Sequence, residues 1–97
     1  MRLLLILSLA LYAAGAQSAE RLPVDVAKFM ERRDGCDHFR GEDPYDEERR
    51  KFLAKNMKAL CTGTDRQLAR LKSKYKGNAS VMEKLNGYEP RIEARGK

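Results

Sequence analysis

Histidine and cysteine are scarce in this chain of 97 residues, which has one histidine, His38, and two cysteines, Cys36 and Cys61. Possible metal ligands gather only in the segment "DGCDHFRGE", at Asp34, Cys36, Asp37, His38 and Glu42. Zinc sites use three or four Cys, His or carboxylate ligands at defined spacings, and a disulfide would remove the thiol. We therefore expect no metal and no cofactor. A small metal-dependent or hydrolytic enzyme that uses Asp37, His38 and Glu42 stays as an alternative.

Long apolar runs are also lacking, apart from one run of 13 residues between Leu3 and Gly15 that follows Arg2. A membrane-spanning helix needs roughly 20 apolar residues, so this run is too short for an anchor. Its layout is typical of a secretory signal peptide, and the small residues that follow favour cleavage after Ala16, with Ala19 as an alternative. We therefore expect a periplasmic or secreted protein with no stable membrane insertion after cleavage.

The remaining chain is too short to enclose a deep catalytic cavity, since about 80 residues bury only roughly 60% of their unfolded surface. Cys36 with His38 as its base would lose its nucleophile to a disulfide. Paired carboxylates for glycoside hydrolysis would lack a cleft to hold a sugar. The sequence therefore predicts no enzyme. It predicts a signal peptide at 1–16, a flexible segment at 17–23, a single helical domain at 24–93 and a tail at 94–97.

Acidic side chains are fewer than basic ones, because removal of Arg2 with the leader leaves 19 basic against 14 acidic residues, a net charge of +5. In an exported protein, anionic envelope surfaces or acidic proteins are more accessible counterparts than nucleic acid. We therefore expect another protein or an envelope component as the partner, and no nucleic acid.

Strand-like alternation is absent, and the pattern predicts an all-α fold, a small bundle of three to four short helices. The first helix starts at Val24 and ends near Gly35. The second has Asp43 as its cap and Pro44 at its first position, and ends at Gly63. Capping boxes at Thr64–Gln67 and Ser80–Glu83 start the third and fourth helices, which end before Gly77 and Pro90.

Apolar residues at helical spacing define the expected buried face of each helix. In the first helix they are Val26, Phe29 and Met30, and in the second Tyr45, Phe52, Leu53, Met57 and Leu60. In the third helix they are Leu68, Leu71 and Tyr75, and in the fourth Val81, Met82, Leu85 and Tyr88.

Cys36 and Cys61 are expected to form an intramolecular disulfide, as an even pair in a small exported domain usually does. Bridged cysteines need Cα atoms within roughly 7 Å of each other, but Cys61 lies about 26 Å along the second helix from its start. We therefore predict that the first helix stops near Gly35. Residues 36–43 would then run back along the second helix as an extended strap, anchored by Phe39.

The segments "CDHFRGEDPYDEERRKFL" and "LCTGTDRQLARLKSKY" resemble short exported proteins of Gram-negative bacteria. This resemblance covers about residues 24–93 and implies a periplasmic or envelope setting, without an activity or functional residues. The leading hypothesis is a non-enzymatic binding protein of the inhibitor, immunity or envelope accessory type. An electrostatic binder of anionic envelope polymers is a further alternative. The candidate interaction surface comprises His38, Arg40, Glu42, Arg49 and Arg50.

Overall fold

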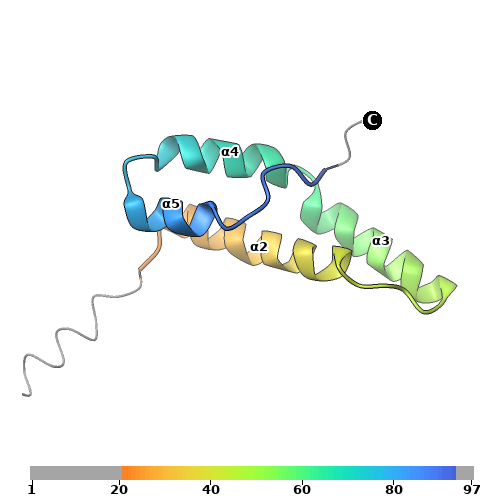
Figure 1. Ribbon diagram of the computed structural model, residues 1–97. Helices are drawn as coiled ribbons and strands as arrows, with labels where there is room; N and C mark the ends of the chain where they lie inside the picture. The colour runs from red at the N-terminus through yellow and green to blue at the C-terminus, as the bar shows by residue number, and fades with distance from the viewer. Residues whose placement is uncertain (1–20, 94–97) are drawn as a thin grey trace, which may run out of the picture.

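The computed structural model describes residues 21–93, which form four α-helices and no strand. The helices are α2 (Val24–Arg40), α3 (Glu47–Cys61), α4 (Thr64–Lys74) and α5 (Ala79–Leu85) (Figure 1). The predicted all-α fold is therefore confirmed. The predicted signal peptide, most of the segment 17–23 and the tail 94–97 lie outside the described residues.

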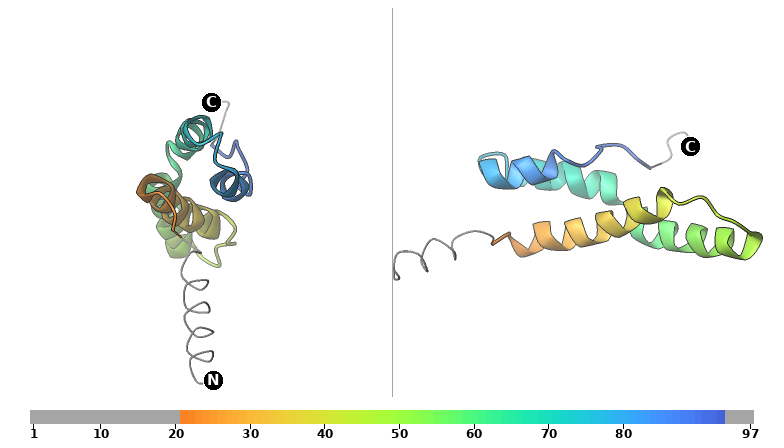
Figure 2. Two further views of the ribbon diagram at one scale, coloured as in Figure 1. Left: turned by 90° about the vertical axis from the view of Figure 1, so that its left-hand side faces the viewer. Right: turned by 60° about the horizontal axis from the view of Figure 1, so that its bottom comes forward.

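The hydrophobic core lies between α2, α4 and α5, which occupy the corners of a triangle when the molecule is viewed end-on (Figure 2). Its buried members are Val26, Phe29, Leu68, Leu71, Val81 and Leu85. All six were predicted from helical spacing, and the predicted Met30, Tyr75, Met82 and Tyr88 pack around them half-buried. Each fully buried apolar side chain contributes about 1.5–3 kcal/mol, so this cluster is the main source of stability.

Polar contacts at both ends hold α4 antiparallel along the first turns of α2. At one end, Lys74 Nζ and Tyr75 Oη both donate to the carboxylate of Asp25, each at 2.8 Å. At the other end, Arg32 donates to the carbonyl of Thr62 and to the side chain of Gln67. The lysine and tyrosine at the end of α4 therefore have a structural role on α2.

The prediction that the first helix stops near Gly35 is wrong, because α2 continues to Arg40. Gly35 stands inside the helix, where an added Cβ would lie 3.2 Å from Cδ1 of Leu60. A glycine inside a helix costs up to about 1 kcal/mol relative to alanine. Here it allows the end of α3 to approach the backbone of α2 closely.

The predicted disulfide is confirmed, with the Cα atoms of Cys36 and Cys61 5.1 Å apart. The predicted strap at 36–43 is wrong, since residues 36–40 belong to α2. The non-helical connection between α2 and α3 consists of residues 41–46. This loop carries the chain outward beyond the end of α2, and α3 then runs back alongside it (Figure 1). Six loop residues can span about 20 Å, close to the length of α3, which brings Cys61 back to Cys36.

The predicted start of the second helix is wrong, and its predicted buried face is confirmed only in part. The cap of α3 is Asp46 instead of Asp43, and its carboxylate accepts a hydrogen bond from the backbone N–H of Arg49 at 2.8 Å. Leu53 is the only buried residue of α3, whereas Tyr45 and Phe52 are 79% and 45% exposed. The reason is that α3 packs against the end of α2, outside the core formed by α2, α4 and α5. Most of the surface of α3 is therefore not in contact with any other helix of residues 21–93.

Neither predicted capping box forms at the starts of α4 and α5. Gly63 precedes α4 with a left-handed φ of 87°, and the hydroxyl of Thr64 donates backward to the carbonyl of Cys61. In α5 the cap is Asn78, whose side-chain oxygen accepts from the N–H of Val81 at 3.1 Å. The capping patterns therefore predicted where both helices begin to within one or two residues, but the capping residue that they predicted is wrong in each helix.

Candidate functional site

The least covered part of the described chain comprises the end of α2, the loop 41–46 and α3, here called the hairpin arm. Phe39 at the end of α2 packs edge-on against Phe52 of α3, with ring centroids 5.9 Å apart. This contact, Leu53 and the disulfide hold the two helices together. The outer faces of α3 stay exposed, which is unusual for a helix that carries apolar residues.

An open groove runs along one of these faces, here called the α3 groove. One part has a volume of about 590 Å³ and lies between α3, Arg40 and the residues Ile92 and Glu93. A second part of about 150 Å³ shares Arg40, Ala54 and Met57 with the first and extends toward the loop. The apolar lining includes Phe39, Pro44, Leu53, Ala54, Met57 and Ile92. The charged lining consists of Arg40, Glu42, Arg50, Lys58 and Glu93.

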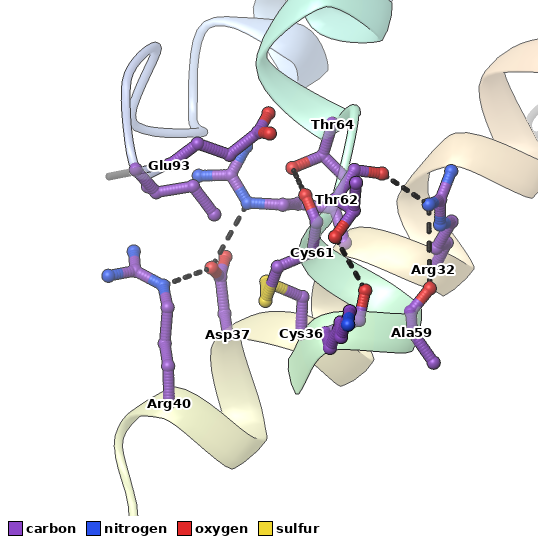
Figure 3. Close-up of a disulfide and its surroundings, with 12 residues drawn as sticks. Arg32, Cys36, Asp37, Arg40, Ala59, Cys61, Thr62, Thr64 and Glu93 are labelled. Carbon is purple, nitrogen blue, oxygen red and sulfur yellow. Dashed lines mark hydrogen bonds and ion pairs between the residues drawn. A yellow bond between two sulfur atoms is a disulfide. The ribbon is translucent and has the colours of Figure 1, made fainter. Parts of the chain in front are cut away.

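Arg40 lies beside the disulfide, and it extends from α2 together with Asp37 (Figure 3). Its Nε donates to Asp37 at 3.0 Å, and its Nη2 lies 3.3 Å from the carboxylate of Glu89. The hydrogen bond to Asp37 raises the pKa of Arg40. Burial acts to raise the pKa of Asp37, but the hydrogen bonds from Arg40 and Arg33 outweigh it and lower this pKa. Both groups are therefore charged at neutral pH.

Glu42 and Arg49 form a two-point ion pair across the loop, with N–O distances of 2.6 and 2.8 Å. The hydrogen bond from Arg49 lowers the pKa of Glu42. The guanidinium of Arg49 also lies 4.7 Å from the ring centroid of Phe52. This arginine therefore ties the loop to α3, and the geometry of the arm does not depend on the loop backbone alone.

The other predicted surface residues have fewer contacts. Arg50 pairs with Glu47 one turn earlier on α3. His38 is exposed on the last turn of α2, with its ring edge-on to Phe39 at 5.4 Å. Of the five predicted residues, Arg40, Glu42 and Arg50 therefore line the α3 groove, Arg49 holds Glu42 in place, and His38 lies outside the groove lining.

The far wall of the groove is built by a contact that the sequence did not reveal. The carboxylate of Glu93 accepts from the backbone N–H groups of Gly63 and Asp65, each at 3.0 Å. In return, the carboxylate of Asp65 accepts from the N–H groups of Ile92 and Glu93. Glu93 thus caps the positive end of α4 from 28 residues away, and no local pattern marks such a pair.

A second unforeseen residue, Arg33, is fully buried beneath the C-terminal segment (residues 86–93). It donates to Asp37 at 3.0 Å and to the carbonyl of Glu89 at 2.8 Å, while its Nη1 has no hydrogen-bond partner. Nearby, the hydroxyl of Tyr88 donates to Asp34 at 2.7 Å. Burial and the contact with Asp34 raise the pKa of Tyr88. These contacts fasten the segment that carries Ile92 and Glu93.

The structure does not gather the residues of the enzyme alternative into a metal site. Within residues 21–93, no group of three or more His, Cys, Asp or Glu side chains is placed to hold a metal ion. Asp37 is bound by two arginines, Glu42 is bound by Arg49, and the sulfur of Cys36 is in the disulfide. His38 shares no hydrogen bond with either carboxylate in this part of the chain.

None of the helices that residues 21–93 form is both long and apolar enough to cross a membrane. Comparisons with protein-family models, with curated proteins and with solved structures found no match to this chain. Function is therefore inferred from the geometry of the α3 groove.

Proposed function

We propose that this chain is a non-enzymatic binding protein that acts outside the cytoplasm and holds another protein in its α3 groove. The observation that carries the proposal is the open groove along a helix with a single buried residue. Contiguous exposed apolar surface rimmed by polar residues is typical of interaction sites and ligand-binding grooves. Phe39, Met57 and Ile92 supply that surface here.

Two further features support this assignment. Aromatic and arginine side chains, the types that contribute most to binding energy at protein interfaces, are present in the groove lining as Phe39, Arg40 and Arg50. The arm is also pre-organised, since the disulfide and the Glu42–Arg49 pair restrain it before any partner arrives. Pre-organisation reduces the entropy lost on binding.

The extracytoplasmic setting rests on the signal-peptide pattern and is compatible with a disulfide between Cys36 and Cys61. The test is the intact mass of the protein recovered from the periplasmic fraction of a Gram-negative host. We expect a chain cleaved after Ala16 or Ala19 that is lighter than its reduced form by the mass of two hydrogen atoms. A full-length chain with two free thiols, found only in the cytoplasm, would refute the export proposal.

Site-specific photo-crosslinking tests the binding function. A photo-reactive amino acid replaces Ala54, an exposed residue that lines the groove, or Ala69, an exposed residue of α4 that serves as the matched control. With the envelope fraction, we expect a discrete crosslinked protein from position 54 and none from position 69. Equal adducts at both positions, or no adduct at position 54, would contradict the assignment of this groove.

A further inference from the structure

We propose that the α3 groove takes an acidic segment of the partner protein, one in which carboxylates alternate with apolar side chains. This inference rests on the proposed binding function and adds the chemistry of the partner. It follows from the charges and the apolar lining of the groove, taken together with the contacts that the charged groups already make.

Two of the three cations that line the groove, Lys58 and Arg50, are more available to a ligand than its carboxylates, whereas the third, Arg40, is paired with Asp37 and Glu89. Lys58 enters no ion pair within residues 21–93. Arg50 is exposed and pairs only with Glu47 on its own helix. By contrast, both oxygens of Glu42 accept from Arg49, and both oxygens of Glu93 accept from backbone N–H groups at the start of α4. A ligand therefore meets a positive field on this face.

The apolar lining selects an acidic protein segment over an anionic polysaccharide. Phe39, Met57 and Ile92 offer surface that stabilises a ligand only if the ligand buries apolar atoms against it. A carboxylated sugar polymer has charge but no apolar side chains to place there. A peptide that mixes glutamate or aspartate with leucine-like residues satisfies both requirements.

Charge also excludes the other occupants that the chain itself offers. Two copies of α3 paired antiparallel about Ala54 would bring Arg50 of one copy opposite Lys58 of the other, since both lie four residues from Ala54. Parallel pairing would bring each of these cations opposite the same residue of the second copy. Like charges in contact are destabilising in either arrangement. The segments 1–20 and 94–97 contain a single acidic side chain, Glu20, against three basic ones, so neither segment offers an acidic stretch.

The length of the groove sets the size of a suitable probe. From Arg50 to Thr62, the helix rises about 18 Å at 1.5 Å per residue. An extended peptide covers that distance with about five or six residues at roughly 3.3 Å each. The fluorescently labelled peptide EELEELEE, acetylated and amidated, therefore covers the groove. KKLKKLKK reverses its charge and EEGEEGEE removes its leucines.

Fluorescence anisotropy at constant ionic strength measures Kd for the oxidised protein and each peptide. We expect EELEELEE to bind at least about tenfold more tightly than EEGEEGEE, because its leucines bury apolar surface against the groove lining and glycine does not. We expect KKLKKLKK to bind more weakly still. Polygalacturonate, added at equal carboxylate concentration, should not displace the bound peptide. Displacement as effective as that by unlabelled EELEELEE would assign the groove to anionic polymers and overturn the proposal.

Paired charge-reversal variants locate the binding. Arg50→Glu with Lys58→Glu should weaken binding of EELEELEE about tenfold or more, because two attractive contacts become repulsive. Arg66→Glu with Arg70→Glu makes the same change in net charge on exposed positions of α4 and should leave groove binding intact. Circular dichroism confirms that both variants fold. Equal loss in the two variants would show that net charge, and not the groove, attracts the peptide.

Failure of this inference is distinguishable from failure of the binding function. If the probe at Ala54 captures a partner but EELEELEE binds no better than KKLKKLKK, the groove binds protein and the acidic assignment is wrong. If position 54 captures nothing and no peptide binds, both proposals are wrong.

Discussion

Opening the Cys36–Cys61 disulfide is expected to release the hairpin arm. The bond joins residues separated by 25 positions, and the closed loop consists of the end of α2, the loop 41–46 and α3. On the chain-entropy model, closing a loop of this length stabilises the folded chain by about 3.5 kcal/mol. That is a large part of the roughly 5 kcal/mol that holds a small domain together.

The loss should concentrate in α3 because this helix lies outside the hydrophobic core. Leu53 is its only buried residue, and its packing on α2 includes the contacts of Leu60 beside Gly35 and of Phe52 with Phe39. By contrast, α4 and α5 share the hydrophobic core with α2. We therefore expect the arm to open locally before the core unfolds.

Amide hydrogen exchange measures this difference directly. Protection of α3 should fall by a factor of about 300–400 in the Cys36→Ala, Cys61→Ala variant, which corresponds to the loss of ~3.5 kcal/mol. Protection in α4 and α5 should fall much less. The reduced wild-type chain, which keeps both sulfur atoms, separates loss of the cross-link from loss of sulfur packing. A change in α3 below about tenfold would falsify this account, as would an equal change in all four helices.

Three further predictions concern the C-terminal segment. Arg33→Met should lower the free energy of unfolding, measured in urea, by about 2 kcal/mol, because the carboxylate of Asp37 and the carbonyl of Glu89 lose a buried hydrogen-bond donor. Glu93→Gln should cost about 1 kcal/mol by weakening the cap of α4. The pKa of Tyr88 is raised, so the fold holds its proton more tightly than the unfolded chain does. Its contribution is complete below the unfolded pKa of about 10 and is lost at higher pH, and Tyr88→Phe should reduce that alkaline loss.

Each of these predictions has a matched control. Arg40→Met removes an exposed arginine from the same cluster and should cost under about 1 kcal/mol. Glu83→Gln makes the change of Glu93→Gln at an exposed position of α5 and should have little effect on urea unfolding. Tyr45→Phe removes an exposed hydroxyl and should leave the alkaline slope unchanged. A control that matches its partner variant would show that the contact in question carries no specific stability.

The sequence by itself predicted an all-α fold of three to four helices, the six core residues and the disulfide. Each of these depends on short-range order: apolar residues such as Val26 and Phe29 recur at helical spacing, and caps and glycines bound the segments. The disulfide needed only a count of cysteines and an expected oxidising compartment. Buried positions in α2, α4 and α5 were predictable because these helices bury the faces that their own periodicity marks.

Local patterns were misleading where a distant segment decides the outcome. Gly35 has the sequence context of a helix end, but it lies inside α2 because Leu60 approaches it from α3. The apolar residues of α3 predict a buried face, yet only Leu53 is buried, since no other helix of residues 21–93 covers that side. The capping role that was predicted for Thr64 belongs to Glu93, which the fold brings to the start of α4.

The candidate site shows the same division. The predicted interaction surface was the expected strap and its charged surroundings, and three of its five residues, Arg40, Glu42 and Arg50, line the α3 groove. The groove itself exists because the loop 41–46 carries α3 outward and because the C-terminal segment places Ile92 beside Met57 in its lining. Residues more than 30 positions apart build that lining. Their approach depends on the energy of the whole fold, which no short stretch of sequence encodes.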